Sequence, residues 1–186
     1  EILARSLIEI TGGNPGCIVS ILEEEIESTS WTIELNQKVR NYFFSPQRIE
    51  DVFIEHASPV LDEIKKEITD LPTIQVLSVF RRINPPIAQE LIKRNLIKGY
   101  SKVASVIALL SENNLYAPKK VDGIFTGDQI ARQMFVAEMK FRKDMRGRYA
   151  EFNAKASEIF AAFVKADVDR RSKDDYDDLD AYIYSY

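Results

Sequence analysis

Apolar residues recur along most of the chain at the spacing of an amphipathic α-helix. The first stripe keeps close to the 3.6-residue period, and similar stripes follow through most of the remaining sequence. The pattern predicts a mainly α-helical protein. The clearest members of the first stripe are Ile2, Leu3, Leu7, Ile8 and Ile10.

Proline follows asparagine or serine at four places, and each pair predicts the start of a helix. Both residues are favourable N-caps, and proline suits the first helical position because the N–H that it lacks would be unpaired there. These starts predict several helices joined by short connections. The four pairs are Asn14-Pro15, Ser45-Pro46, Ser58-Pro59 and Asn84-Pro85.

The first of these pairs stands in an unusual segment, Thr11-Gly12-Gly13-Asn14-Pro15-Gly16. Glycine readily adopts the left-handed conformation found just after a helix, so Gly12 and Gly13 predict a helix end. Asn14 and Pro15 then predict a new helix. The structural interpretation is a helix stop and restart. The functional alternative is that the proline ring and the helix N-terminus behind it face a ligand such as a nucleotide.

The centre of the chain carries the most diagnostic pattern. Residues 73–82 are predicted as one helix, Asn84-Pro85 begins a second, and a turn at Gly99 leads into a third. A short apolar segment and a lysine-containing turn then predict a two-stranded β-hairpin near residues 115–126. Three short helices and a hairpin are typical of a winged-helix domain. The alternative is three bundle helices followed by an irregular loop.

Two longer helical patterns follow and predict a C-terminal helical hairpin. The expected fold is therefore mainly α, with a helical bundle, a winged-helix domain with a small two-stranded β-wing, and this hairpin. The predicted domains are residues 1–70 (bundle), 71–127 (winged helix) and 128–186 (hairpin with an acidic, tyrosine-containing tail).

The composition argues against catalysis by this chain. Its 186 residues include one histidine and one cysteine, which rules out histidine triads, multi-histidine metal sites and a cysteine-rich zinc site. The sequence holds no phosphate-binding glycine-rich loop. We therefore expect no enzyme activity, no metal and no resident cofactor in this chain. The absence of a long apolar run and of a disulfide framework indicates a cytoplasmic location without a membrane partner.

Lysines near the third central helix support a DNA-binding hypothesis. A net charge of −4 argues against a general nucleic-acid coat, so any contact would use a local basic face. The start of that helix and the expected wing tip supply such groups, although the middle of the helix has neither arginine nor glutamine for reading bases. The candidate DNA-contacting residues are Lys98, Ser101, Lys102, Lys119 and Lys120.

The order of these segments resembles the C-terminal half of the nucleotide-binding module in STAND-type signal-transduction NTPases, the class that includes the apoptotic ATPases. Gly13-Asn14-Pro15 resembles the family's Gly-x-Pro motif, and residues 77–82 resemble the first helix of its winged-helix domain. The segment from Phe125 to Asp128 falls where many members carry Met-His-Asp. The resemblance spans roughly residues 1–165 and rests more on order than on any one motif.

The resemblance implies a set of nucleotide-contacting residues. Pro15 is expected near the adenine, together with Gly13 and Asn14, and Asp128 matches the last residue of the Met-His-Asp motif. Gly127 stands in place of the histidine that contacts the β-phosphate of ADP, so the usual side-chain donor is missing. The resemblance also implies that ATP or ADP with Mg²⁺ binds in a longer parent protein.

These observations lead to one main hypothesis and two alternatives. The main hypothesis is a non-catalytic regulatory part of a nucleotide-dependent signalling switch, whose partner is an N-terminal nucleotide-binding lobe of the same protein. The first alternative is a winged-helix DNA-binding transcriptional regulator. The second is a helical scaffold that binds proteins or self-associates through the apolar stripe from Tyr149 to Phe163.

Overall fold

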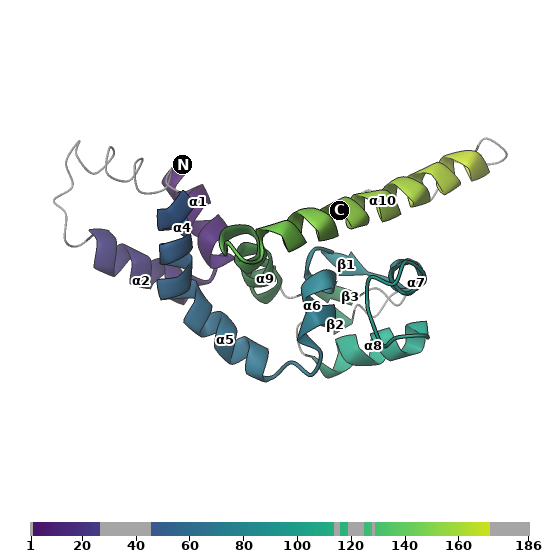
Figure 1. The fold of residues 1–186 in the computed structure, drawn as a ribbon, viewed down its shortest axis with the longest axis horizontal. Coiled ribbons are helices and arrows are strands. Elements are labelled where there is room, and N and C mark those ends of the chain that lie inside the picture. The colour runs from purple at the N-terminus through teal and green to yellow at the C-terminus, as the bar shows by residue number, and fades with distance from the viewer. Residues whose placement is uncertain (1, 27–45, 114–115, 119–124, 128, 172–186) are drawn as a thin grey trace. The chain divides into compact units, whose positions relative to one another are not determined.

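The computed structural model describes residues 2–26, 46–113, 116–118, 125–127 and 129–171. Most of these residues are helical, so the prediction of a mainly α protein is confirmed (Figure 1). The chain forms two compact units that alternate along the sequence. The first unit combines residues 1–68 with 129–149, and the second combines 69–128 with 150–186.

The first unit is built from helices, and α9 lies at its centre. Helix α9 packs against α1, η1, α4 and α5, so a segment from late in the chain completes a core begun by the first 68 residues. The unit's elements are α1 (Ile2–Thr11), α2 (Pro15–Ile26), α4 (Pro46–Val52), the π-helix η1 (Phe53–Ala57), α5 (Ser58–Lys66), α9 (Gln129–Phe141) and the start of α10 (Arg146–Arg171).

Buried apolar side chains from α1, α2, α4, η1, α5 and α9 fill the core of the first unit. Phe53, Leu61 and Met134 are fully buried and come from η1, α5 and α9. Burial of a large apolar side chain contributes about 1.5–3 kcal/mol, so these groups are the main stabilising contribution. Further core members are Leu7, Ile10, Cys17, Ile21, Val52, Ala57, Phe135, Ala137 and Met139.

The helix start predicted at Ser58-Pro59 coincides with the start of α5 at Ser58, but Ser58 does not act as the N-cap. Helices α4, η1 and α5 follow one another without a break. Proline has no N–H and would clash with the carbonyl group four residues before it in a regular α-helix. The π-turn before Pro59 provides a different geometry, in which the Ser58 N–H donates to the Phe53 carbonyl. The helix therefore continues through the proline.

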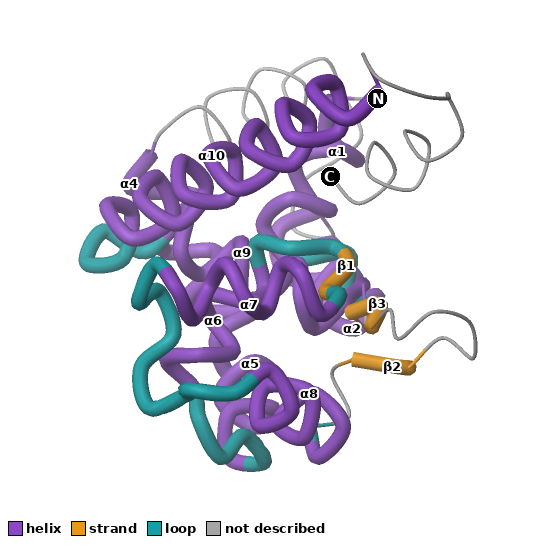
Figure 2. The backbone as a smooth tube through the Cα atoms, turned by 90° about the vertical axis from the view of Figure 1, so that its right-hand side faces the viewer, coloured by secondary structure: helices purple, strands orange, loops and turns teal. Residues whose placement is uncertain are grey.

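The described part of the second unit contains α6, α7, α8, most of α10 and a short antiparallel sheet. Strand β3 lies between β1 and β2 and pairs antiparallel with both. Thr126 in β3 lies opposite Arg82 of β1 on one side and opposite Ala117 of β2 on the other. Figure 2 shows the three strands as short orange segments. The elements are α6 (Leu71–Ser78), β1 (Arg82–Ile83), α7 (Pro85–Lys93), α8 (Val103–Glu112), β2 (Tyr116–Pro118) and β3 (Phe125–Gly127), followed by most of α10.

The prediction of one helix over residues 73–82 is wrong at both ends. Helix α6 begins at Leu71, because the side chain of Asp70 accepts a hydrogen bond from the Thr73 N–H and caps the helix. It ends at Ser78, and Arg82 belongs to β1. Residues 76–80 are apolar except for Ser78 and show no clear period, so no local signal marks the change from helix to strand.

The core of the second unit is apolar and joins the helices to α10. Leu77, Leu91 and Ile159 are fully buried, and the rings of Phe80 and Phe160 lie 5.9 Å apart between centroids. Other buried members are Ile74, Val76, Ile83, Ile87, Ala88, Ile97, Val106, Leu109, Leu110 and Ala156. The helix predicted after Gly99 matches α8, whose Val106 and Leu110 point into this core.

The two helices predicted as the third domain fall in different units. Helix α9 belongs to the first unit, whereas α10 from Ala150 onward belongs to the second. The three-part division at residues 70 and 127 stays a prediction. The aromatic-ended pattern of residues 36–43, which also predicts a short helix, and the acidic tail beyond residue 171 lie outside the described residues. Over the described part of the chain, no helix has the length and apolar character needed to cross a membrane.

Candidate functional site

The candidate site is the corner between α1 and α2, residues 11–16, and its backbone follows the sequence prediction. Gly12 and Gly13 both have positive φ angles, 64° and 79°, in the left-handed region that favours glycine. Pro15 is the first residue of α2. The Asn14 Oδ1 accepts a hydrogen bond of 3.1 Å from the Cys17 N–H, so Asn14 is the N-cap.

Thr11 holds the end of α1 against this corner. Its buried hydroxyl donates to the Leu7 carbonyl over 2.6 Å and accepts from the Gly13 N–H over 3.3 Å. The Asn14 N–H donates to the Thr11 carbonyl over 3.2 Å. Polar groups of the turn therefore have partners within the turn, and its shape is fixed by short-range hydrogen bonds.

The corner packs directly on α9. A Cβ atom on Gly12 would lie 2.4 Å from the backbone nitrogen of Met134 and 2.8 Å from the carbonyl carbon of Gln133. Such distances leave no room for any side chain, so only glycine fits here. The Asn14 Nδ2 also lies 3.9 Å from the Met134 Sδ. The corner therefore contacts α9 about one turn after that helix begins at Gln129.

A pocket of about 220 Å³ lies beside this contact, between α1 and α9. Ile8, Val136 and Ala137 give it an apolar wall, Glu9 on α1 brings a carboxylate to it, and Arg132 and Lys140 on α9 bring cationic side chains. Gln133 joins the pocket to the corner, because its Oε1 lies 3.5 Å from the Cβ position of Gly13.

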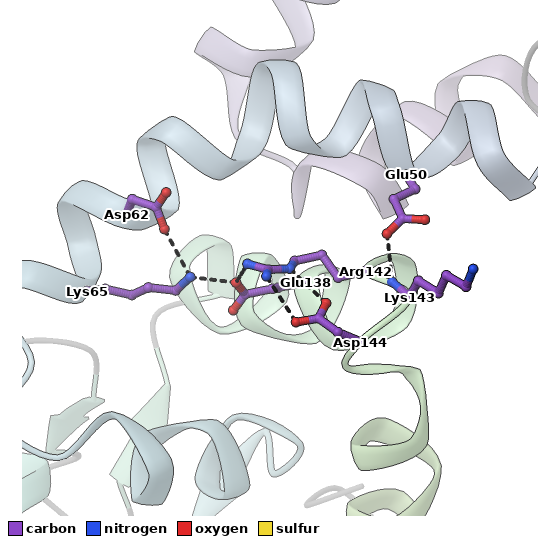
Figure 3. A network of polar contacts seen from close by, with 7 residues as sticks. All are labelled: Glu50, Asp62, Lys65, Glu138, Arg142, Lys143 and Asp144. Carbon is purple, nitrogen blue, oxygen red and sulfur yellow. Dashed lines mark hydrogen bonds and ion pairs between the residues drawn. The ribbon is translucent and has the colours of Figure 1, made fainter.

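A buried carboxylate links α9 to α5 on another side of the first unit (Figure 3). Glu138 is 1% exposed, and its Oε1 accepts from the Lys65 Nζ at 2.5 Å and from the Arg142 Nη1 at 3.2 Å. Lys65 also pairs with Asp62, and Arg142 with Asp144. The Glu138 Oε2 is buried without a hydrogen-bond partner among the described residues.

Structural contacts occupy much of the strongest basic cluster in the sequence, residues 140–148. The Arg142 guanidinium binds Glu138 and Asp144, and these contacts raise its pKa, with the hydrogen bond to Asp144 as the largest cause. The same pairing lowers the pKa of Asp144. The Lys140 Nζ lies 5.2 Å from the centroid of the Tyr149 ring, at cation–π distance. Figure 3 also shows Glu50 on α4 accepting from the Lys143 backbone N–H.

The structure describes most of the predicted nucleotide-contacting residues. Gly13, Asn14 and Pro15 form the corner, with the proline ring exposed. Gly127 is the last residue of β3, and Asp128 lies outside the described residues. The roles of all five residues stay predictions.

Three of the five predicted DNA-contacting residues lie in the described part of the chain. Lys98, Ser101 and Lys102 are exposed, and Lys102 is the N-cap residue of α8. Lys119 and Lys120 lie outside the described residues. The outward face of α8 carries small side chains and one acid rather than cations, namely Ala104, Ser105, Ala108, Ser111 and Glu112. This face offers few groups for reading bases or contacting phosphates.

Two polar contacts were not predicted from the sequence. His56 in η1 is buried, and its Nδ1 lies 3.0 Å from the Ser20 Oγ on α2. Tyr100 donates to the Asp70 Oδ2 at 2.9 Å, and burial together with this bond raises the pKa of Tyr100 to about 12. Both pairs join residues 30 or more positions apart, so only the tertiary fold brings them together.

Two further expectations concern metals and protein partners. Among the described residues, no group of three or more histidine, cysteine or carboxylate side chains is placed to hold a metal ion. The stripe proposed for a protein scaffold is partly used inside the second unit, since Ala156 and Ile159 are buried there. Phe152 and Phe163 are half-buried.

Comparison with known proteins gives no relative for this chain. No protein-family model, no curated protein and no solved structure matches it.

Proposed function

We propose that this chain is the regulatory, non-catalytic part of a nucleotide-dependent signalling switch of the STAND type. The observation that carries the proposal is the contact between the Gly12–Pro15 corner and α9. The resemblance assigns nucleotide contacts to this corner and to Gly127 and Asp128, which precede α9 in the sequence. The contact of the corner with Gln133 and Met134 of α9 supports a shared role for the corner and this part of the chain.

The arrangement of the second unit supports the finer fold in this proposal. Three helices, a strand between the first two of them, and a sheet ordered β1-β3-β2 are what a winged helix with a small β-wing requires. We propose that the second unit is such a domain. Its hairpin tip, like the two lysines predicted there, lies in residues 119–124, outside the described part.

In the proposed mechanism, ATP or ADP with Mg²⁺ binds between a phosphate-binding lobe of the same protein and the first unit. Nucleotide exchange then changes the relative stability of a closed and an open state. A ligand shifts such an equilibrium only through its different affinities for the two states. The surface exposed in the open state binds protein partners or another copy of the protein. This switching takes place in the cytoplasm.

The experiment measures ADP affinity in the longer parent protein that the proposal requires. Pro15→Ala and Asp128→Ala are each expected to weaken binding, because the proposal places the proline ring on the base and the carboxylate near the phosphates. Pro85→Ala is the matched control. Like Pro15, Pro85 is an exposed first residue of a helix after an asparagine cap, but it belongs to the second unit.

Isothermal titration with each variant distinguishes the outcomes. Weaker ADP binding in the Pro15 or Asp128 variant, with the Pro85 variant unchanged, supports the proposal. Unchanged affinity in both test variants overturns it.

DNA binding is the second candidate function, favoured by the exposure of Lys98 and Lys102 beside the start of α8. It predicts binding of duplex DNA that weakens as salt rises. Replacing Lys98, Lys102, Lys119 and Lys120 together by alanine should then remove binding. Fluorescence anisotropy at low salt is the measurement, and no binding of any duplex there eliminates this candidate.

A further inference from the structure

The turn between α9 and α10 carries exposed cations at a helix end that disfavours them. Arg146 and Arg148 lie in the first turn of α10, which has no acidic residue, and Lys143 lies just before them. The N-terminus of a helix has a partial positive charge, so it repels cations and attracts anions. The Arg146 Nη2 also lies 3.5 Å from the Phe141 carbonyl oxygen. We call Lys143, Arg146 and Arg148 the basic turn.

The acids beside the basic turn already have other partners. Both carboxylate oxygens of Asp144 accept from the Arg142 guanidinium at 3.1 Å. The hydrogen bonds from Arg142, more than the charge of Arg148, hold the pKa of Asp144 below its usual range. Glu50 accepts from the Lys143 backbone N–H, and the Lys143 side chain extends away from both acids in Figure 3. Among the described residues, no carboxylate forms an ion pair with the basic turn.

A strongly anionic segment that complements the basic turn occurs in the same sequence. Residues 172–186 contain five aspartates and one lysine, and their net charge of −4 equals the formal net charge of the whole chain. The rest of the chain is therefore neutral overall, and the excess negative charge is concentrated in this segment. We call residues 174–180 the acidic segment, and its members are Asp174, Asp175, Asp177, Asp178 and Asp180.

The length of α10 limits which copy of the acidic segment can reach the basic turn. Helix α10 runs from Arg146 to Arg171, so its ends are about 37 Å apart at a rise of about 1.5 Å per residue. Asp180 follows Arg171 by nine residues, which span at most about 32 Å when fully extended. Within one chain, only the last aspartate side chain would approach the basic turn. The acidic segment of a second copy has no such limit.

We propose that the acidic segment of one chain binds the basic turn of a second copy. The carboxylates neutralise the three cations and place negative charge at the N-terminus of α10. Because the two surfaces differ, the contact joins copies head to tail, in a ring or an open chain. Exposed ion pairs are individually weak and are screened by salt, so the association is salt-sensitive. The contact needs no nucleotide, and its test is therefore independent of the proposed function.

Analytical ultracentrifugation of the 186-residue chain measures this association. At about 0.05 M salt, the average mass should rise with protein concentration. Raising the salt to about 0.5 M should weaken the association about tenfold or more, because it shortens the range of charge interactions. A chain that stays monomeric at low salt up to millimolar concentration overturns the proposal.

Two variants and a matched control test the surfaces. The turn variant replaces the three cations of the basic turn by glutamine, and the tail variant replaces the five aspartates of the acidic segment by asparagine. Each should be monomeric. The control removes three other exposed cations and should associate as the unchanged chain does. Its substitutions are Lys66→Gln, Arg81→Gln and Lys165→Gln. Loss of association in the control as well would show that only the total charge matters, and would contradict the proposal.

Mixing the turn variant with the tail variant tests whether the contact is head to tail. Each variant keeps one of the two complementary surfaces, so the mixture should form a one-to-one pair although neither variant associates alone. A mixture that stays monomeric overturns the proposal.

A labelled peptide of residues 172–186 tests the occupant directly. It should bind the tail variant, whose basic turn is intact, about tenfold or more tightly than it binds the turn variant. Fluorescence anisotropy at low salt measures both affinities. Equal affinity for the two variants overturns the proposal. It is also overturned if the tail variant binds duplex DNA or anionic vesicles but not the peptide, because the basic turn would then serve a different anion.

Discussion

Two Asn-Pro corners in this chain have the same local structure and different surroundings. Asn14 and Asn84 each cap a helix through the side-chain oxygen, at 3.1 Å from the Cys17 N–H and 2.9 Å from the Ile87 N–H. In each case proline is the first helical residue and is exposed.

The surroundings make only one of these corners a candidate site. The Asn14 corner follows two left-handed glycines and lies against α9, more than 110 residues later in the sequence. The Asn84 corner follows strand β1 within the second unit. The comparison teaches that a short motif sets a helix start, whereas a site also needs a second segment packed against it. Four predictions test this difference, from the largest expected effect to the smallest.

Gly12→Ala should destabilise the first unit by about 2–5 kcal/mol, because it combines a left-handed alanine with a clash against α9. Gly99→Ala is the control. Gly99 has a φ of 85° in the second unit, and a Cβ there meets nothing within 4 Å. Urea unfolding with residue-resolved hydrogen exchange compares the two. Equal losses of stability in the two variants would contradict the prediction, because they would show that α9 shifts at little cost to make room for a Cβ at residue 12.

Glu138→Gln should lower the free energy of unfolding of the first unit by about 2–3 kcal/mol. The change leaves Lys65 and Arg142 without their shared carboxylate, and their side chains are only 15% and 34% exposed. The control is Glu90→Gln in the second unit, where Glu90 also pairs with a lysine and an arginine, but within one helix and at its surface. We expect about 1 kcal/mol or less there. A larger loss for Glu90 than for Glu138 contradicts the comparison.

Asn14→Ala and Asn84→Ala should each cost about 1 kcal/mol, since each removes one N-cap. Thermal unfolding of both variants measures the loss. Similar values support the view that the two corners are equivalent as local structures. A much larger loss at Asn14 would mean that its contact with Met134 contributes more than the cap does.

Tyr100 makes the stability of the second unit sensitive to alkali. Burial, followed by the hydrogen bond to Asp70, raises its pKa from 10.0 to about 12 in the folded chain. The resulting stability is fully present below pH 10 and is lost as the pH rises through about 12. Tyr100→Phe should remove this part of the pH dependence, as measured by unfolding at several alkaline pH values. The α1 and α9 amides of the first unit serve as the internal reference.

Local residue chemistry made parts of the fold predictable. The end of α1, the cap and start of α2, and the cap and start of α7 follow from Gly12, Asn14 and Asn84, because glycine, asparagine and proline act within one turn of the backbone. At Ser58-Pro59 the local argument placed the start of α5 but not its cap, because a π-turn leads directly into the helix there. The local argument failed at Arg82, where pairing with β3 decided the strand.

The candidate site, like the fold, was only partly predictable from the sequence. The corner was predicted from its own residues, but no pattern in the sequence indicated that Gly12 touches Met134 or that Arg132 and Ile8 line one pocket. The acid partners of Lys65 and Arg142 were likewise not predicted, because Glu138 meets Lys65 from 73 residues away. Contacts of this kind depend on which helices pack together, and the apolar stripes of the helices do not specify that choice.

The sequence by itself determined that the chain is helical, where several helices begin and end, and that Gly12 and Gly13 turn the chain between the first two. These features depend on backbone preferences and caps that act over a few residues. Only the tertiary structure decided that α9 completes the first unit and that the corner meets it beside a pocket. The physical reason is that close packing selects one partner surface among many apolar ones, and this selection involves side chains far apart in the chain.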